Sequence, residues 1–152
     1  MLLKPNGIGG RLMKMILTLS AVSVLCLISM LHVYWACGGR WGSKVAVPVK
    51  EGGDGPTFVP SKTGTLLVAV LIVIAAMLIL MQGGYLQSFQ ANIISKIGCI
   101  VCTFVFFIRA IGDFKYVGFF KKITHSQFAR NDTWFYSPLC LFFGVVYMFV
   151  LL

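Results

Sequence analysis

The sequence predicts an all-α integral membrane protein, a four-helix bundle forming a single domain over residues 1–152. The first reason is composition: 59% of the residues are hydrophobic and 11% are charged, with a mean hydropathy of +0.91. Soluble domains have about 25% charged residues, and so few charges could not cover a water-exposed surface. The second reason is four apolar runs, most of them near the ~20 residues that a helix needs to cross a bilayer.

The four expected spans differ in how clearly the sequence marks them. The first follows a short basic segment and is too long for the apolar part of a signal peptide. The second has no charged residue, and in the first part of the last one Ser137 and Pro138 form a typical helix start. The spans cover about residues 15–36, 65–81, 93–111 and 134–152.

The charge distribution predicts the topology. Four spans place the loops 38–64 and 113–132 on one side and both termini on the other. Of the 13 lysines and arginines, the terminal side has only Lys4, Arg11, Lys14 and Lys96. The positive-inside rule then predicts a multi-pass protein of the cell membrane with both loops in the cytoplasm. The net charge of +9 fits membrane lipids as partners, and no motif indicates nucleic acid.

Chemically active side chains collect at the boundary on the two-loop side. His32 and Trp35 are three residues apart at the end of the first span, hence on one helical face. Arg109 and Asp113 are four apart at the end of the third span, again on one face. The other ligand-binding candidates at this boundary are Arg40, Trp41, Asp132 and Tyr136.

We expect His32, Arg109 and Asp113 to form one polar cluster. An unpaired charge near mid-membrane costs about 2–3 kcal/mol, and Asp113 is close enough in sequence to neutralise Arg109. His32 needs a partner at similar depth, so the first and third helices would gain by facing each other. The expected wall of this pocket is Trp35 or Trp41, and its expected rim is Asp132 or Tyr136.

Three segments together resemble a known group of proteins. They are HVYWACGGRWG, FIRAIGDFKYVGFFK and DTWFYSPLCL, and the resemblance extends from Leu31 to Leu141. In this order and spacing they are similar to small bacterial four-helix integral membrane proteins that are recorded only as a domain of unknown function. The resemblance implies a bacterial membrane protein and no particular activity.

Each candidate also has a structural interpretation. His32 either hydrogen-bonds a neighbouring helix or exchanges protons near neutral pH. Arg109 and Asp113 either form a structural ion pair or bind a ligand. Asp132 is equally explained as a helix cap, and the tryptophans as interface anchors.

The cysteines give no sign of a metal site or a cofactor. Cys99 and Cys102 have the spacing of a redox pair, but they lie in an apolar helix without a basic neighbour, which favours packing. Cys26, Cys37 and Cys140 show no metal-ligand spacing. We expect neither a metal nor a cofactor.

Two classes of function fit these observations. The first is a non-catalytic protein: a subunit, an assembly partner, or a binder of a lipid or small ligand, with a protein partner or a second copy of the chain at its polar end. The alternative is a membrane-embedded enzyme. Its catalytic candidates are His32 with Asp113 or Asp132 as acid and base, and Arg109 would hold an anionic, lipid-like substrate.

Overall fold

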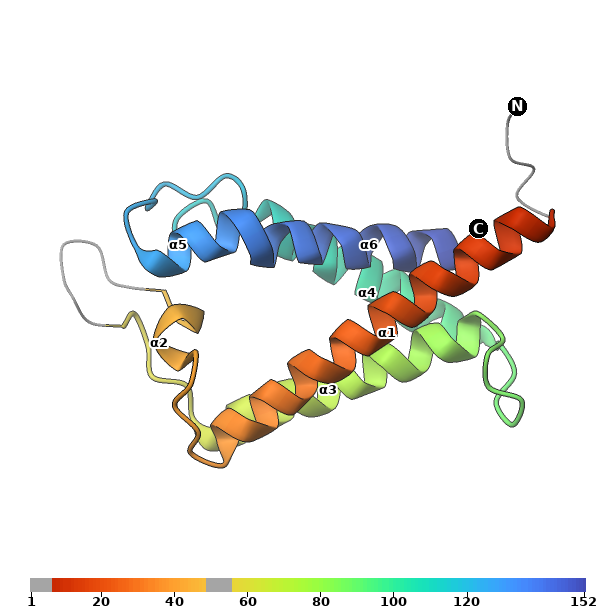
Figure 1. Cartoon of the computed structure of the whole chain (residues 1–152), viewed down its shortest axis with the longest axis horizontal. Coiled ribbons are helices and arrows are strands. Elements are labelled where there is room, and N and C mark those ends of the chain that lie inside the picture. The colour runs from red at the N-terminus through yellow and green to blue at the C-terminus, as the bar shows by residue number, and fades with distance from the viewer. Residues whose placement is uncertain (1–6, 49–55) are drawn as a thin grey trace.

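Helices form the regular structure of the chain in the computed structural model, which describes residues 7–48 and 56–152 (Figure 1). Within these ranges, four helical runs are long and apolar enough to cross a membrane. They are α1 (Ile8–Ala36), α3 (Lys62–Gln82), α4 (Ile93–Ile111) and a last run made of α5 (Gln127–Asn131), the π-helical turn η1 (Asp132–Tyr136) and α6 (Ser137–Leu151). The predicted fold class, an all-α four-helix integral membrane protein, is confirmed.

The first helix begins earlier than expected, at Ile8 rather than near residue 15. Its 29 residues extend about 43 Å at ~1.5 Å per residue, which exceeds the ~30 Å of bilayer hydrocarbon. The added turns contain Arg11 and Lys14. The Lys14 ammonium lies 5.6 Å from the ring centroid of Phe149, so the start of α1 meets the end of α6.

Side-chain caps define where the two central helices begin. The Ser61 hydroxyl accepts a hydrogen bond from the Gly64 N–H at 3.1 Å, which starts α3. Asn92 and Ser95 form a capping box at the start of α4, each side chain accepting from the other's backbone N–H at 3.0 Å. The Ser95 hydroxyl also donates to Gln82 at 2.8 Å. This bond ties the start of α4 to the end of α3.

The last helical run begins earlier than the expected residue 134, although its final part, α6, does begin at Ser137. The run as a whole begins at Gln127, where the Ser126 hydroxyl accepts from the Ala129 N–H at 3.0 Å. In η1 the Ser137 N–H donates to the Asp132 carbonyl, five residues back. Pro138 has no N–H and cannot donate a hydrogen bond to the helical turn before it. The wide π-helical turn η1 lies in this part of the helix, immediately before Ser137 and Pro138.

The core is formed by buried residues from all four spanning helices, α1, α3, α4 and α6. α1 packs against α3, and α4 packs against α6. The two pairs are joined mainly by contacts of α3 with α4. The buried Tyr147 hydroxyl donates to the Ala75 carbonyl at 2.6 Å, and the Ser29 hydroxyl donates to Ala69 at 3.0 Å. Alanines at these contacts let the helix backbones approach closely. Large side chains elsewhere, such as Phe104, point outward, as a lipid-facing surface requires.

The two helix pairs separate toward one end of the molecule (Figure 1). The short helix α2 (Ser43–Ala46) and residues 112–126 lie at this end, which we call the two-loop end. The start of α1 and the end of α6 lie at the opposite end (Figure 1). The Tyr136 hydroxyl donates to the Val45 carbonyl at 3.2 Å, so α2 connects to the last helical run.

Candidate functional site

A buried carboxylate organises the α4–α6 side of the two-loop end. Asp132 has no exposed surface, and each of its oxygens accepts hydrogen bonds. Oδ1 accepts from Arg109 Nη2 at 2.9 Å, while Oδ2 accepts from Lys121 Nζ at 3.0 Å and from the Gly118 N–H at 2.7 Å. A buried charge is tolerated when it is paired and hydrogen-bonded in this way. We call Asp132, Arg109 and Lys121 the ion cluster.

Lys121 uses all three of its protons inside the protein. Nζ donates to the Gly118 carbonyl at 2.9 Å, to Asp132 at 3.0 Å and to the Thr133 hydroxyl at 2.6 Å. Its side chain is only 2% exposed, whereas that of Arg109 is 34% exposed. Lys121 therefore holds the segment before α5 against η1, and Arg109 forms the outer edge of the ion cluster.

The expected pair of Arg109 with Asp113 is wrong. α4 ends at Ile111, and Gly112 follows with a φ of +94°, so Asp113 is no longer on the helical face of Arg109. Instead, Asp113 Oδ1 accepts from the N–H groups of Lys115, Tyr116 and Val117 at 2.9, 2.7 and 2.9 Å. Partial desolvation raises the pKa of Asp113, but these backbone bonds outweigh it and hold the pKa below its ordinary value.

Two glycines close the turn that Asp113 organises. Gly112 and Gly118 both have positive φ, and a Cβ on Gly118 would meet the Ile111 carbonyl and the Gly112 backbone. The Asp113 N–H donates to the Val117 carbonyl at 3.2 Å and the Phe119 N–H donates to Ala110 at 2.9 Å. This tight turn delivers the Gly118 N–H to Asp132.

His32 lies in a separate environment, on the α1–α3 side. Its Nδ1 donates to the Ile28 carbonyl at 2.8 Å, one turn back on the same helix. The Trp35 ring lies edge-on to the imidazole, with centroids 5.3 Å apart. Trp35 Nε1 donates to the Trp41 carbonyl at 2.8 Å, which fixes the indole at the end of α1.

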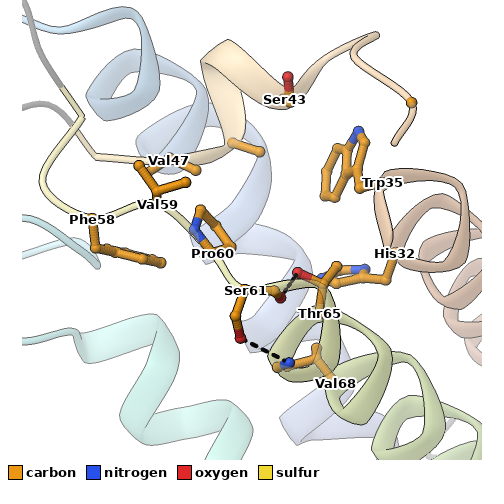
Figure 2. A pocket seen from close by; sticks show the side chains of 13 residues that line it. His32, Trp35, Ser43, Val47, Phe58, Val59, Pro60, Ser61, Thr65 and Val68 are labelled. Carbon is orange, nitrogen blue, oxygen red and sulfur yellow. Dashed lines mark hydrogen bonds between the residues drawn. The ribbon is translucent and has the colours of Figure 1, made fainter. Parts of the chain in front are cut away.

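His32 and Trp35 line an open cavity of about 640 Å³, which we call the His32 pocket. Figure 2 shows both rings projecting from α1, with the apolar side chains of Val47, Phe58, Val59 and Pro60 opposite them and the start of α3 below. The described lining consists of His32, Trp35, Gly39, Ser43, Ala46, Val47, Phe58, Val59, Pro60, Ser61, Gly64, Thr65 and Val68. Most of this surface is apolar, with one imidazole and three hydroxyls.

The predicted single cluster is therefore divided. His32 and Trp35 share the His32 pocket, whereas Arg109 and Asp132 share the ion cluster, and Asp113 stabilises its own turn. The remaining candidates, Trp41, Arg40 and Tyr136, form hydrogen bonds that support the neighbouring structure. The backbone carbonyl of Trp41 accepts from the Trp35 indole, and that of Arg40 accepts from the Ser43 hydroxyl. The Tyr136 hydroxyl donates to Val45 of α2.

Lys121 is the site residue that the sequence did not reveal. It lies beside Lys122 in a segment where aromatic and basic residues alternate, and no periodic pattern there indicates which of the two lysines is buried. Lys121 is nevertheless buried and Lys122 is exposed. Asp132 gave no signal for a second cation either, because Arg109 alone already balances the charge of one carboxylate.

The cysteines and acidic residues do not form a metal centre in the described ranges. There, no group of three or more histidine, cysteine or acidic side chains could hold an ion. Cys99 is buried and its thiol donates to the Leu78 carbonyl at 3.5 Å, a packing contact between α4 and α3. Cys102 is also a free thiol.

Comparison with known proteins identifies the family. No curated protein and no solved structure matches the chain. One family model does match, and it extends over most of the chain, from α1 to the core residue Tyr147 of α6. It includes all three segments on which the resemblance to a domain of unknown function rested. Because residues 25–147 match the model described as "Protein of unknown function (DUF3995)", the chain belongs to that family.

Proposed function

We propose that this protein is a non-catalytic membrane protein that binds a lipid or similar amphipathic molecule in the His32 pocket. The observation that carries the proposal is the pocket itself, a cavity of about 640 Å³ at the end of two spanning helices. Ligand sites are concave, mostly apolar, and contain a few fixed polar groups. The His32 pocket has this composition, and its position favours a ligand with both an apolar and a polar part.

The two rings of α1 are held in place before any ligand arrives. Internal hydrogen bonds fix the His32 imidazole to Ile28 and the Trp35 indole to Trp41. Fixed side chains lose less conformational freedom on binding, which favours affinity. The ion cluster supports the opposite side of the two-loop end, and α2 joins the two sides through Tyr136.

The enzyme alternative has no comparable support. Acid–base catalysis needs a second titratable group within hydrogen-bond reach of the reacting atom. In the described part of the pocket lining no carboxylate lies beside His32, and the carboxylates of Asp113 and Asp132 bond to other groups. A role as subunit or assembly partner remains an outcome of the test below.

Mass spectrometry of gently solubilised protein tests the proposal. Val68→Trp would fill the pocket, whereas Val70→Trp places the same ring on an exposed position of α3 outside the described lining. We expect a copurifying lipid that Val68→Trp removes and Val70→Trp retains. Equal lipid content in all three proteins would refute the pocket as the binding site, and a stoichiometric copurifying protein would favour the subunit role.

We also propose a bacterial cell membrane as the location, with the two-loop end facing the cytoplasm. The support is the excess of lysine and arginine at that end, including Lys115, Lys121 and Lys122. Such an excess sets orientation through the positive-inside rule.

A further inference from the structure

The His32 pocket has a hydrogen-bonding character that narrows the class of ligand. We propose that its ligand has an uncharged headgroup bearing a free hydroxyl, as in a lipid alcohol or an acylglycerol, rather than a phosphate or another ion. This inference rests on the proposed function and specifies its ligand. Three features of the lining carry it: its charge, the commitment of its donors, and its free acceptors.

The described lining contains no lysine, arginine or acidic side chain. An ionised headgroup would find no ion-pair partner among these described residues, and burying an unpaired charge is strongly unfavourable. The cationic side chains of the ion cluster do not compensate, since neither Arg109 nor Lys121 is among the lining residues. A neutral headgroup avoids this cost.

The side-chain donors of the lining are already committed inside the protein. Trp35 Nε1 donates to the Trp41 carbonyl, the Ser43 hydroxyl donates to Arg40 at 2.8 Å, and the Thr65 hydroxyl donates to Ser61 at 2.9 Å. The Ser61 hydroxyl accepts from the Gly64 N–H and is hydrogen-bonded to the Thr63 hydroxyl at 3.4 Å. Figure 2 shows the bonds of Ser61 at the start of α3, along the lower wall of the pocket.

What remains on these side chains are acceptors. A carbonyl can only accept, so the bond to Ile28 requires the proton of a neutral His32 on Nδ1. Nε2 of that imidazole then carries a lone pair, and the ring projects into the pocket (Figure 2). The committed hydroxyls of Ser43 and Thr65 retain lone pairs as well. A ligand that satisfies these groups must itself supply a donor, and a hydroxyl is the neutral group that does so.

The apolar part of the pocket accommodates the rest of such a molecule. Trp35, Phe58, Val59 and Val68 offer ring and aliphatic surface beside the polar groups. The exposed apolar sides of α1 and α3 continue from the pocket along the spanning helices. Acyl chains can therefore extend into the bilayer while the hydroxyl reaches His32.

Three lipids with the same acyl chains test this inference: dioleoylglycerol, its O-methyl ether and dioleoyl phosphatidic acid. Each is added to the full chain in phosphatidylcholine nanodiscs, and the bound lipid is measured by native mass spectrometry. We expect dioleoylglycerol to bind three- to tenfold more tightly than its ether, since one neutral hydrogen bond is worth about that factor. Phosphatidic acid should bind more weakly than dioleoylglycerol.

Variants of His32 identify the acceptor. His32→Phe keeps a ring without a lone pair and should remove the preference for the hydroxyl, while His32→Gln keeps an acceptor and should restore part of it. His125→Phe is the matched control, because His125 is exposed on the other loop. A preference unchanged in His32→Phe would overturn the assignment of Nε2.

The remaining outcomes separate this inference from the proposed function. Equal binding of the alcohol and the ether, or tighter binding of phosphatidic acid, would overturn the hydroxyl headgroup while leaving a lipid in the pocket. Binding of all three lipids that Val68→Trp does not weaken would overturn the pocket itself. Failure of all three to bind, with no copurifying lipid, would overturn both proposals.

Discussion

Replacing Asp132 by asparagine tests whether the ion cluster stabilises the fold. The substitution keeps the size of the side chain but removes the negative charge that two cations share. Lys121 is 2% exposed, so its ammonium would remain buried without a negative charge to balance it. Breaking a buried pair by neutralising one partner costs about 3–5 kcal/mol. Arg109 is 34% exposed and regains some hydration, which favours the lower end, about 3 kcal/mol.

The matched control is Asp113→Asn, the same chemical change on an exposed turn. An amide oxygen can still accept from the backbone N–H groups that Asp113 now binds. We therefore expect Asp113→Asn to cost at most about 1 kcal/mol. Denaturant titration in mixed micelles, followed by circular dichroism, measures both variants against the wild type.

A double variant shows whether the unpaired ammonium is the cause. Lys121→Met in the Asp132→Asn background removes the buried cation and keeps a side chain of similar length. Replacing buried ion pairs by neutral groups is often nearly neutral, so the double variant should be more stable than Asp132→Asn alone. Equal losses for Asp132→Asn and Asp113→Asn, or additive losses in the double variant, would refute the reasoning.

Three further predictions concern the turn after α4 and the topology. Gly118→Ala should destabilise the protein by more than Gly84→Ala in the same titration, because both have positive φ but only a Cβ on Gly118 meets backbone atoms. The Asp113 carboxylate should contribute stability above its ordinary pKa of 3.8, lost as the pH falls from there through its lowered folded-state pKa; Asp113→Asn should reduce this acid-dependent loss. Single cysteines at Lys50 and Lys122, each in a background without other cysteines, should be labelled from the same side of the membrane, and labelling from opposite sides would refute the shared end.

The spanning helices were predictable because lipid imposes one simple pattern. A run such as that of α3 must be apolar throughout and must satisfy its own backbone, so composition alone locates it. The boundaries that the prediction missed depend on short-range detail instead. α1 extends back to Ile8 through glycines and basic residues, and the last run begins at Gln127 because Ser126 supplies a cap.

The candidate site was predictable only in its location at one end. Helical spacing correctly placed His32 with Trp35, since both lie on a regular helix. The same rule failed for Arg109 and Asp113 because α4 ends between them at Gly112. The true partner, Asp132, is 23 residues from Arg109, and contacts of that kind depend on packing that no local pattern reveals.

The π-helical turn η1 changes which residues before Ser137 lie on the buried face of the last helical run. In an unbroken α-helix, residues four apart share a face, so Thr133 would lie above the buried Ser137. Thr133 is exposed, and Asp132, five residues before Ser137, is buried instead. One residue corresponds to about 100° of helical rotation. Deleting one residue between Asp132 and Ser137 would place Asp132 four residues before Ser137, so that an unbroken α-helix would keep the carboxylate on the buried face. Without such a deletion, it is the wide turn of η1 that keeps Asp132 on the same face as Ser137.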